Sequence, residues 1–501
     1  MTIKNYLVAL SLLLAATSCK EDFLEKAPLD SVNTANYYQT ATDAVNAVNA
    51  AYQPLQRPKL YNLRVWATDI MAGNSVVGAG GGTDGIETQD QANFVTATNN
   101  AGVLDLYRGP APGILQCNIV LQRVPSISMD ETLKNRVLGE AKFLRAHYYF
   151  LLVQLFGDVP LILSPQVVGD DLKVKRTPKA DVYAQIIKDL TEAIDQLPLH
   201  TTYSASDLGR VSKGAATGLL AKVYLVLGNY QKTADLCQQV ISMGYALNAS
   251  YADNFTAQKK NTPESLFEVQ YSGATTYDFF GSDFNQASWI SAFTGPRNAD
   301  FVAGGYGWDQ PTQEFVNAYE AGDLRKDMTV FYEGGPTFDG AAYKKSYSLT
   351  GYNLRKFLVP KSISPAYNTS PANFPVLRFS DVLLMQAEAL NELGKTTEAQ
   401  APATDSNSGG PLNRVRKRVG LPNVQGLSQA ALRDKILHER RMELAFEGHR
   451  WFDLIRVNNG QYALDFLHSI GKSNAATKHL LYPIPQQEID ANPNLTQNPG
   501  Y

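Results

Sequence analysis

The chain has few cysteines, few histidines and no excess of one charge. Its 501 residues include three Cys and six His, and 45 Lys and Arg nearly balance 48 Asp and Glu, so the formal net charge is −3. Proteins that bind nucleic acid through bulk positive charge carry a basic surplus, so this class is excluded. A hydrophobic content of 44% also excludes a disordered chain. The length predicts two or three domains, or one large fused body.

The three cysteines leave little scope for disulfides. Cys19 ends an apolar N-terminal segment, so only Cys117 and Cys237 stand in the body of the chain. Cys237 falls on an apolar helix face, which predicts a buried free thiol. A Cys117–Cys237 disulfide is the alternative, and the spacing alone does not decide between the two.

Motifs for catalysis and for cofactors are also absent. The sequence contains no G-x-S-x-G, Walker or C-x-x-C motif, and its histidines lack metal-ligand spacing. His438-Glu439 begins like a zinc-binding helix, but position 442 is Met442 where a second histidine is needed. Residues 80–85 fit G-x-G-x-x-G, but residues 86–94 show no convincing helix pattern, so we expect a flexible loop. We therefore expect no enzyme activity, no metal and no cofactor.

Three glutamates, Glu439, Glu443 and Glu447, step by four along one predicted helix. A glycosidase needs two carboxyl groups that flank one glycosidic bond, which makes a hydrolase an alternative to weigh. Arginines at positions 440, 441 and 450 share this helix. Ion pairs that lock helices together are therefore the interpretation that we prefer.

Residues 1–18 have the pattern of a signal peptide. Lys4 supplies the positive charge, and residues 6–16 form an apolar run too short to span a bilayer. The small residues before Cys19 resemble a bacterial lipobox, although Ala16 replaces the preferred leucine. An ordinary cleaved signal peptide is the alternative. We expect acylated Cys19 to anchor the chain in membrane lipid.

Amphipathic periodicity predicts helices in most of the remaining chain. We expect helices over residues 42–53, 134–156, 179–196, 212–227, 230–243 and 428–457, and a loop over 73–102. The pair 212–243 turns at Gly228-Asn229, and residues 379–400 repeat the arrangement, so both resemble tetratricopeptide units. These degenerate repeats predict a mainly α fold, in which tetratricopeptide-like helix pairs form a helical scaffold.

Residues 250–375 have a different composition, rich in Gly, Asn, Ser, Phe and Tyr. We expect a loop-rich irregular region with short strands here, and binding residues often lie on loops held by a rigid scaffold. The predicted division is a signal peptide (1–18), an N-terminal helical part (19–249), a ligand-binding insertion (250–375) and a C-terminal helical part with an extended tail (376–501).

Four separated motifs resemble one family. The segments EAKFLRAHYYFLLVQLFGDVPL (140–161), RFSDVLLMQAEALNELG (378–394), ERRMELAFEGHRWFDLIR (439–456) and LYPIPQQEIDANPNLTQNPGY (481–501) together are similar to SusD/RagB-type lipoproteins. The resemblance implies an α-helical surface lipoprotein of the outer membrane. It also implies a substrate-binding lid on a TonB-dependent, SusC-like transporter. The motifs themselves concern the scaffold and do not identify a ligand.

Candidate ligand residues follow from residue type and position. A sugar ring offers a flat face to aromatic side chains and a rim of hydroxyl groups to polar ones. The two loop-rich regions contain suitable side chains: Asp69, Asn74 and Asp84 in one, and Trp289, Arg297, Tyr306, Trp308 and Asp309 in the other, with Tyr277 and Phe279 nearby. We favour Trp289 and Trp308, because both lie among small and polar residues. Trp66 follows Leu63 and Val65, which indicates a buried segment.

The leading hypothesis is capture of an extracellular glycan without catalysis. An oligopeptide ligand is the alternative within binding, and a peptide site needs fewer exposed aromatic rings. A surface glycoside hydrolase and a purely structural subunit of a transporter are the other classes. An exposed aromatic surface, a polar cleft, or neither would distinguish these hypotheses.

Overall fold

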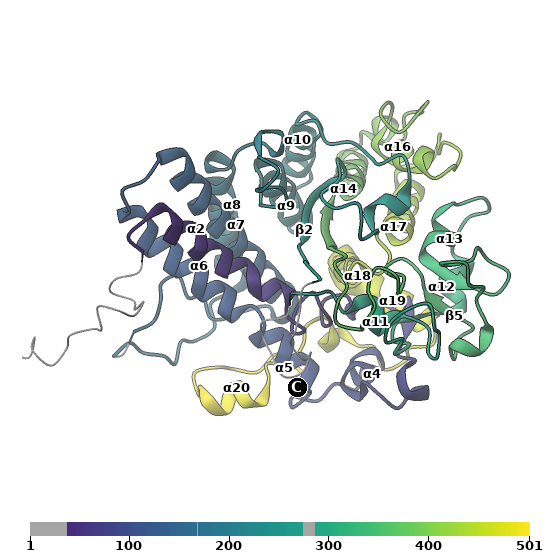
Figure 1. Cartoon of the computed structure of the whole chain (residues 1–501), viewed down its shortest axis with the longest axis horizontal. Coiled ribbons are helices and arrows are strands. Elements are labelled where there is room, and N and C mark those ends of the chain that lie inside the picture. The colour runs from purple at the N-terminus through teal and green to yellow at the C-terminus, as the bar shows by residue number, and fades with distance from the viewer. Residues whose placement is uncertain (1–37, 168, 274–285) are drawn as a thin grey trace, which may run out of the picture.

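The computed structural model of the chain describes residues 38–167, 169–273 and 286–501. A continuous row of helices crosses this structure, and each helix packs against the next. In Figure 1 the row runs from the left side toward the right, where the irregular region lies. Its members are α2 (Ala41–Tyr52), α6 (Ala111–Arg123), α7 (Glu131–Phe156), α8 (Lys179–Gln196), α9 (Lys213–Val226), α10 (Tyr230–Ile241), α14 (Phe379–Glu392) and α17 (Gln429–Glu443). The mainly α, tetratricopeptide-like scaffold is thereby confirmed.

The ends of these helices follow local rules. Asp130 caps α7 by accepting the N–H of Leu133, and Gly157 ends the same helix with a φ of +70°. Helix α2 begins one residue earlier than expected, because Thr40 rather than Thr42 caps it, and Asp43 completes a capping box. The second helix of the predicted unit 379–400 is only one turn long, α15 (Thr396–Ala399). Helix α14 packs against this short helix and also lies between α10 and α17.

The predicted helix 428–457 is interrupted. Helix α17 ends at Glu443, and α18 (Arg450–Arg456) begins after a tight loop. Phe446 and Gly448 have φ values of +64° and +77°, which an α-helix does not allow. The Gly448 N–H donates to Asp69 Oδ2 at 2.8 Å, so this contact replaces a helical hydrogen bond. The prediction of one long helix was therefore wrong, because tertiary contacts break it.

The region around residues 250–375 holds short strands and short helices. Three antiparallel pairs join β1 (Ser75–Val76) to β3 (Gln310–Pro311), β2 (Ser265–Val269) to β6 (Phe374–Arg378), and β4 (Val330–Tyr332) to β5 (Tyr352–Leu354). The short helices are α11 (Ile290–Thr294), α12 (Gln313–Asn317) and α13 (Arg325–Thr329). The expected irregular texture with short strands is confirmed.

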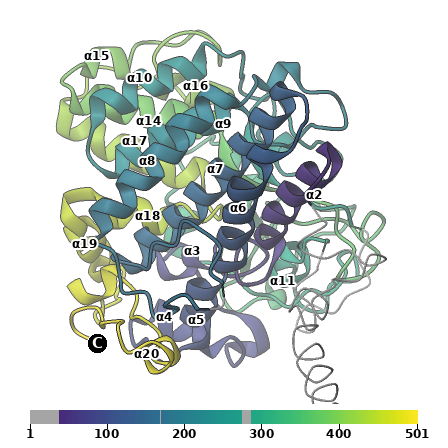
Figure 2. The same ribbon diagram turned by 90° about the vertical axis from the view of Figure 1, so that its left-hand side faces the viewer.

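The remaining α-helices lie at both ends of the molecule, except α3 and α19, which lie between the ends. Figure 2 shows α10 and α16 at one end and α4, α5 and α20 at the other. These elements are α3 (Thr68–Met71), α4 (Ile86–Ala92), α5 (Ala101–Arg108), α16 (Pro411–Arg418), α19 (Gln461–Ser469) and α20 (Gln486–Ala491). Helix α4 corrects the expectation of a loop at 86–94. The segment before it is still no dinucleotide loop, because β1 has two residues and pairs antiparallel.

One hydrophobic core joins the helical and irregular parts. It extends from Ala44 in α2 to Leu495 near the C-terminus, and a smaller cluster surrounds Phe331. Cys117 and Cys237 are buried in this core as free thiols, as predicted for Cys237, so the alternative disulfide is not formed. In the part of the chain described here, no helix is both long and apolar enough to cross a bilayer.

Candidate functional site

The two loop-rich regions of the sequence meet in one place. Strand β1 pairs with β3, where Ser75 lies opposite Pro311 and Val76 opposite Gln310. The Thr312 N–H extends the contact by donating to the Asn74 carbonyl oxygen at 3.0 Å. Segments more than two hundred residues apart thus form one surface, as a shared binding site requires.

An aromatic cluster underlies this surface, with Phe293 of α11 at its centre. The ring centroids of Tyr306, Trp308 and Trp66 lie 5.7, 5.6 and 6.3 Å from that of Phe293, and the centroid of Trp289 lies at 6.4 Å. Tyr367 packs edge-on against Trp289 at 5.0 Å. Such edge and tilted contacts are favourable between aromatic rings. We refer to these six residues (Trp66, Trp289, Phe293, Tyr306, Trp308 and Tyr367) as the aromatic cluster.

Exposure divides the aromatic cluster into a core and an edge. The tryptophans at 66, 289 and 308 are only 1%, 3% and 7% exposed, whereas Tyr306 and Tyr367 are 37% and 40% exposed. The two tyrosines lie on neighbouring segments, because a Cβ on Gly304 would stand 3.2 Å from the Tyr367 Cβ. The exposed aromatic surface therefore consists of two tyrosines supported by buried rings.

Two of the predicted polar residues lie near Trp308. The Trp308 ring packs over Gly85, where an added Cβ would approach it to 2.5 Å, and Asp84 beside Gly85 is exposed. The half-buried Arg297 lies along Gly307, whose added Cβ would meet the Arg297 side chain at 2.9 Å. Arg297 thus lies beside Tyr306 and Trp308. Asp84, from the other loop-rich region, is next to Gly85 under the Trp308 ring, and its carboxyl group lies against Gly80.

The other predicted polar residues lie beneath this surface and are fully buried. Ser75 donates to Asp309 Oδ1, and Asp309 Oδ2 accepts no hydrogen bond from any described residue. Asn74 donates to Asp69 Oδ1 at 3.3 Å, and its own Oδ1 accepts from Arg441 Nε at 2.9 Å. In this arrangement the three side chains hold the loops together. Their contact with a ligand, like that of Trp289 and Trp308, stays a prediction.

Burial changes the acidity of these carboxyl groups. It raises the pKa of Asp69 to about 7, against the opposing effect of the Gly448 N–H. Burial also raises the pKa of Asp309 well above its usual range, while the Ser75 hydroxyl opposes the shift and the nearby Asp69 adds to it. At neutral pH these two groups therefore favour the protonated form much more than an exposed aspartate does.

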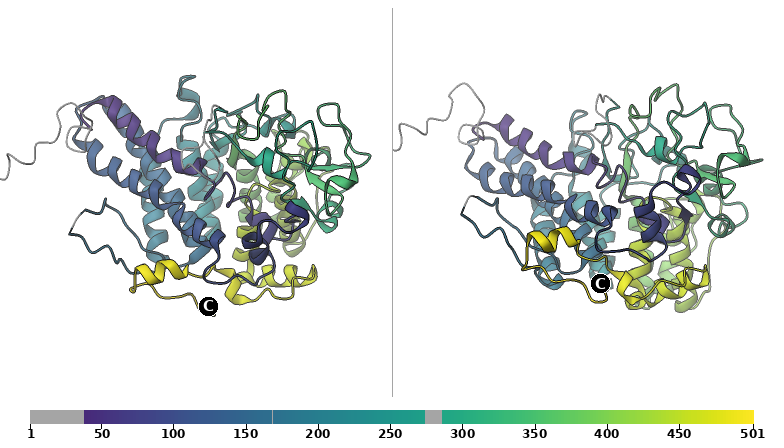
Figure 3. Two further views of the ribbon diagram at one scale, coloured as in Figure 1. Left: turned by 60° about the horizontal axis from the view of Figure 1, so that its bottom comes forward. Right: turned by 90° about the horizontal axis from the view of Figure 1, so that it is seen from below.

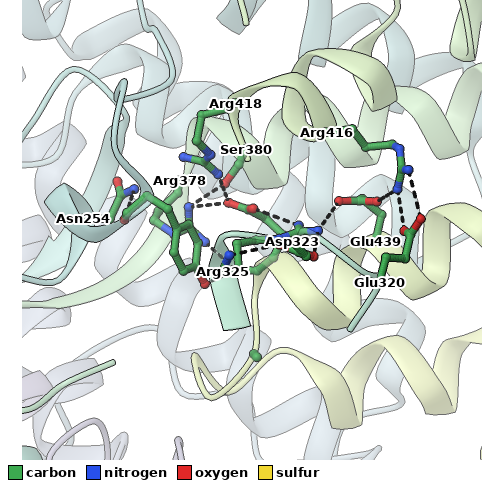
Figure 4. Close-up of polar contacts among 12 residues, drawn as sticks. Asn254, Glu320, Asp323, Arg325, Arg378, Ser380, Arg416, Arg418 and Glu439 are labelled. Atoms are coloured by element: carbon green, nitrogen blue, oxygen red, sulfur yellow. Dashed lines mark hydrogen bonds and ion pairs between the residues drawn. The ribbon is translucent and has the colours of Figure 1, made fainter. Parts of the chain in front are cut away.

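The glutamates of the 439–447 motif occupy a separate, ionic centre, and Figure 4 shows Glu439 of this centre beside Arg325 and Arg416. Glu443 contacts Arg418 at 2.5 Å, Arg378 at 3.0 Å and Arg325 at 3.2 Å, and all four side chains are buried. Burial alone would raise the pKa of Glu443, but the three guanidinium groups outweigh it and hold the pKa well below its usual range. We refer to these residues as the Glu443 ion centre.

The neighbouring glutamates extend this network. Glu439 pairs with Arg325 at 2.7 Å and with Arg416 at 2.8 Å, while Glu447 pairs with Arg378 at 2.7 Å and Lys356 at 2.6 Å. Their partners come from other segments, so the predicted locking of helices by ion pairs is confirmed. The same contacts occupy the carboxylates, which leaves no free acid and base here for glycoside hydrolysis. Across residues 38–167, 169–273 and 286–501, no group of three or more metal-ligating side chains is present.

Sequence reasoning missed two members of the aromatic cluster. Phe293 has no distinguishing local pattern, since α11 is a five-residue helix. Tyr367 stands among Ser, Pro and Asn in the segment 364–370, the same kind of neighbourhood that favoured Trp289 and Trp308. Three earlier expectations, Cys19 with its signal peptide, Tyr277 and Phe279, lie outside the described residues.

Comparisons with known proteins cover the chain almost from end to end. A family described as "SusD family" matches residues 242–501, and one described as "Starch-binding associating with outer membrane" matches residues 22–225. The chain is 28% identical to the SusD-like protein P2 of Formosa agariphila over the whole of both chains. It is 24% identical to the starch-binding protein SusD of Bacteroides thetaiotaomicron over 77% of this chain and 76% of that protein. The solved structure of a laminarin-binding SusD-like protein superimposes with a TM-score of 0.79 at 30% identity, covering 93% of this chain and all of that one.

Proposed function

Because the chain belongs to the SusD family, we propose that it is a non-catalytic lipoprotein that captures an extracellular glycan at the cell surface. It delivers this oligo- or polysaccharide to a TonB-dependent, SusC-like transporter in the outer membrane. Acylated Cys19 anchors it to the outer leaflet, on the extracellular side. The names of two relatives, which specify starch and laminarin binding, support a glucan as the ligand.

The observation that carries this proposal is the exposed edge of the aromatic cluster. Tyr306 and Tyr367 offer ring surface to solvent, Arg297 lies along Gly307 next to Tyr306, and the exposed Asp84 precedes Gly85, on which the Trp308 ring packs. Aromatic rings stack on the apolar face of a sugar, and carboxylates and guanidinium groups bind its hydroxyl rim. Buried rings fix the orientation of the tyrosines before the ligand arrives, which reduces the entropy lost on binding.

We assign the central binding role to Tyr306 and Tyr367. Trp289 and Trp308 support them from below, and Asp69, Asn74 and Asp309 hold the two loop-rich regions in register. Residues 250–375 act as a ligand-binding insertion between two helical parts. An oligopeptide ligand is less well supported, because a peptide site needs fewer exposed aromatic rings than this surface presents.

Affinity electrophoresis of the chain from Lys20 onward tests the proposal. Native gels that contain laminarin, starch or another polysaccharide should retard the wild-type protein for at least one of them. Tyr306→Ala and Tyr367→Ala should each weaken binding about 3- to 10-fold, the equivalent of about 1 kcal/mol for one stacked ring. Leu227→Ala is the matched control, since Leu227 is 45% exposed and lies on the distant turn between α9 and α10.

The outcomes separate the competing functions. Retardation that survives both tyrosine substitutions would retain glycan binding but reject this site. Retardation by no polysaccharide, together with binding of oligopeptides, would reject the proposed function. Production of shorter sugars from a retarded polysaccharide would contradict the non-catalytic assignment.

A further inference from the structure

A buried glutamine lies beneath the proposed glycan site, at the start of β3. Gln310 is fully buried, and its backbone pairs with Val76 of β1. Its side-chain amide bonds two further loops: Nε2 donates to the Gly307 carbonyl at 2.9 Å, and Oε1 accepts the Leu349 N–H at 2.8 Å. Figure 3 shows the indigo chain of residues 75–92 beside the green chain of the irregular region. Gln310 therefore joins three segments of the chain.

The two partners fix the orientation of the Gln310 amide. An amide oxygen only accepts hydrogen bonds, and an amide nitrogen only donates them. A rotated amide would place two donors together at Leu349 and two acceptors together at Gly307. Since an unpaired polar group in the interior costs free energy, the two loops are held in their positions together.

Gly78 provides the space that the Gln310 side chain occupies. A Cβ added at Gly78 would lie only 1.9 Å from the Gln310 side chain. The φ of Gly78 is −100°, a negative value that residues with side chains also adopt. Glycine is therefore needed here for close packing and not for its backbone conformation. The loop that carries β1 is matched in shape to the buried amide.

The loop that Gln310 holds presents one exposed apolar side chain. Leu349 is 61% exposed, and its Cδ1 lies 3.6 Å from the position of a Cβ added at Gly82. The loop around Gly82 is itself fixed, because Gln89 Nε2 donates to the carbonyls of Gly82 and Asp84 at 2.7 and 2.8 Å. Leu349 thus adjoins the loop of Asp84 directly and the Tyr306 segment through the shared amide.

We propose that Gln310 is a positioning residue of the glycan site and that Leu349 forms a third side of this site, an inference that rests on the proposed function. The buried amide fixes the separation between Leu349 and Tyr306, which precedes Gly307. Tyr306 offers a face to one sugar ring, and Leu349 offers apolar contact to the same glycan. Carbohydrates have apolar C–H faces, so an exposed leucine held rigidly beside a tyrosine adds contact area.

Substitution of Leu349 tests the third side of the site. In native gels with the polysaccharide that retards the wild-type protein, Leu349→Ala should weaken binding about 3-fold, as expected for a partly exposed apolar contact. Leu324→Ala is the matched control, since Leu324 is 65% exposed and packs near Gly420, outside the site. It should bind like wild type.

Substitution of Gln310 tests the positioning role. Gln310→Met nearly keeps the size of the side chain but removes both hydrogen bonds, so it should weaken binding about 10-fold or more. Gln400→Met is the matched control: Gln400 is 6% exposed, and its amide forms the same pair of bonds with the N–H and carbonyl of Leu427, at 3.0 and 2.9 Å. Gln400 caps α15, which is well separated from α11 in Figure 2. Both variants should unfold at a lower temperature, but only Gln310→Met should lose affinity.

Gln310→Glu adds a test by rescue. Burial raises the pKa of the introduced carboxyl group, and its protonated form can donate to the Gly307 carbonyl and accept from the opposite loop, as the amide does. The ionised form only accepts. Relative to wild type at the same pH, binding should be within about 3-fold at pH 5 and about 10-fold weaker at pH 8. The nearby charged groups, Asp69, Asp309 and Arg297, are common to both proteins, so this ratio removes their own pH dependence.

The outcomes distinguish this inference from the proposed function. If Tyr306→Ala weakens binding but Leu349→Ala binds like wild type, the third side is overturned and the proposed function stands. Equal losses of affinity for Gln310→Met and Gln400→Met, or a relative affinity of Gln310→Glu that is constant with pH, would overturn the positioning role. If no polysaccharide retards the wild-type protein, the proposed function and this inference are both rejected. Because Leu349 is exposed, its substitution decides the inference even if Gln310→Met does not fold.

Discussion

The Glu443 ion centre and the aromatic cluster perform the same structural task with opposite chemistry. Each joins segments that are far apart in the sequence: the ion centre ties α17 to β6, α13 and α16, and the cluster ties α11 to the loops that carry β1 and β3. The ion centre uses buried charges and has no exposed member among its four residues. The aromatic cluster uses rings and leaves two of them open to solvent. Buried charge fixes a scaffold, whereas a half-exposed ring packs on one side and leaves the other side open to solvent.

The largest expected effect comes from the ion centre. Glu443→Gln removes the negative charge that three buried arginines share, and an uncompensated buried charge costs about 3–5 kcal/mol. Urea denaturation at pH 7 should show this loss in the free energy of unfolding, with polysaccharide affinity of the folded protein unchanged. A loss below about 1 kcal/mol would contradict the view that these charges hold the scaffold together.

Trp308→Ala should cause the second-largest loss of stability. Its comparison with Tyr306→Ala tests whether buried and exposed rings of the aromatic cluster have different roles. Removal of this nearly buried ring opens a cavity beside Phe293 and Gly85 and costs about 3 kcal/mol. Tyr306→Ala should cost less than about 1 kcal/mol, because Tyr306 is 37% exposed. Thermal unfolding and affinity gels of both variants give the comparison. If Trp308→Ala abolished binding without loss of stability, Trp308 itself would contact the ligand, as its sequence context predicts.

The pH dependence of stability should have opposite signs in the two regions. Glu443 has a lowered pKa in the folded state. Its contribution to the free energy of unfolding is therefore present above 4.5, its pKa in the unfolded state, and is lost as the pH falls toward the folded-state pKa. Asp69 and Asp309 have raised pKa values in the folded state. Their full contribution to the free energy of unfolding is therefore present below 3.8, the pKa of an aspartate in the unfolded state. The Asp69 contribution is lost as the pH rises through about 7.

Asp309→Asn tests how the raised pKa of one buried carboxyl group affects stability. The neutral amide avoids the cost of a buried carboxylate, so the variant should be more stable than wild type by about 1 kcal/mol at pH 8. The difference should vanish near pH 3.5, where the wild-type carboxyl is protonated in the folded state and largely so in the unfolded state. Denaturation at both pH values measures it. A variant less stable than wild type at pH 8 would show that the ionised form of Asp309 supports the loops.

The smallest effect is expected from an ion pair outside the buried centre. Glu392 pairs with Arg433 at 2.6 Å, but the Arg433 side chain is 38% exposed. Glu392→Gln should therefore lower the free energy of unfolding by less than about 1 kcal/mol. A loss comparable to that of Glu443→Gln would remove the distinction between buried and exposed charge pairs in this protein.

Much of the scaffold could be predicted from local sequence. The bounds of α8 match the prediction of 179–196, and α7 ends at Gly157 as its C-cap glycine indicated. Apolar spacing and capping residues act within a few positions, so a single sequence contains the information. The break after Glu443 was missed, because a contact with Asp69 in a distant segment causes it. Helix α4 was missed for the opposite reason, since its seven residues carry too weak a period.

The residues of the candidate site could be predicted less well from the local sequence. The composition of the two loop-rich regions identified Tyr306 and Arg297, which lie side by side, and Asp84, which is exposed and lies near Trp308. It did not separate them from Asp69, Asn74 and Asp309, which have equally polar types but are buried. Residue type states what a side chain can do, and exposure decides which side chains are free to do it.

The amino-acid sequence by itself determined the helical scaffold, the ionic character of the 439–447 motif and the resemblance to one family. These features depend on short-range periodicity and on residue identity. The tertiary structure alone decided which rings face solvent and which carboxyl groups are buried. Those properties arise where distant segments meet, as at the pairing of β1 with β3. Burial is set by neighbours in space, and adjacency along the chain does not specify it.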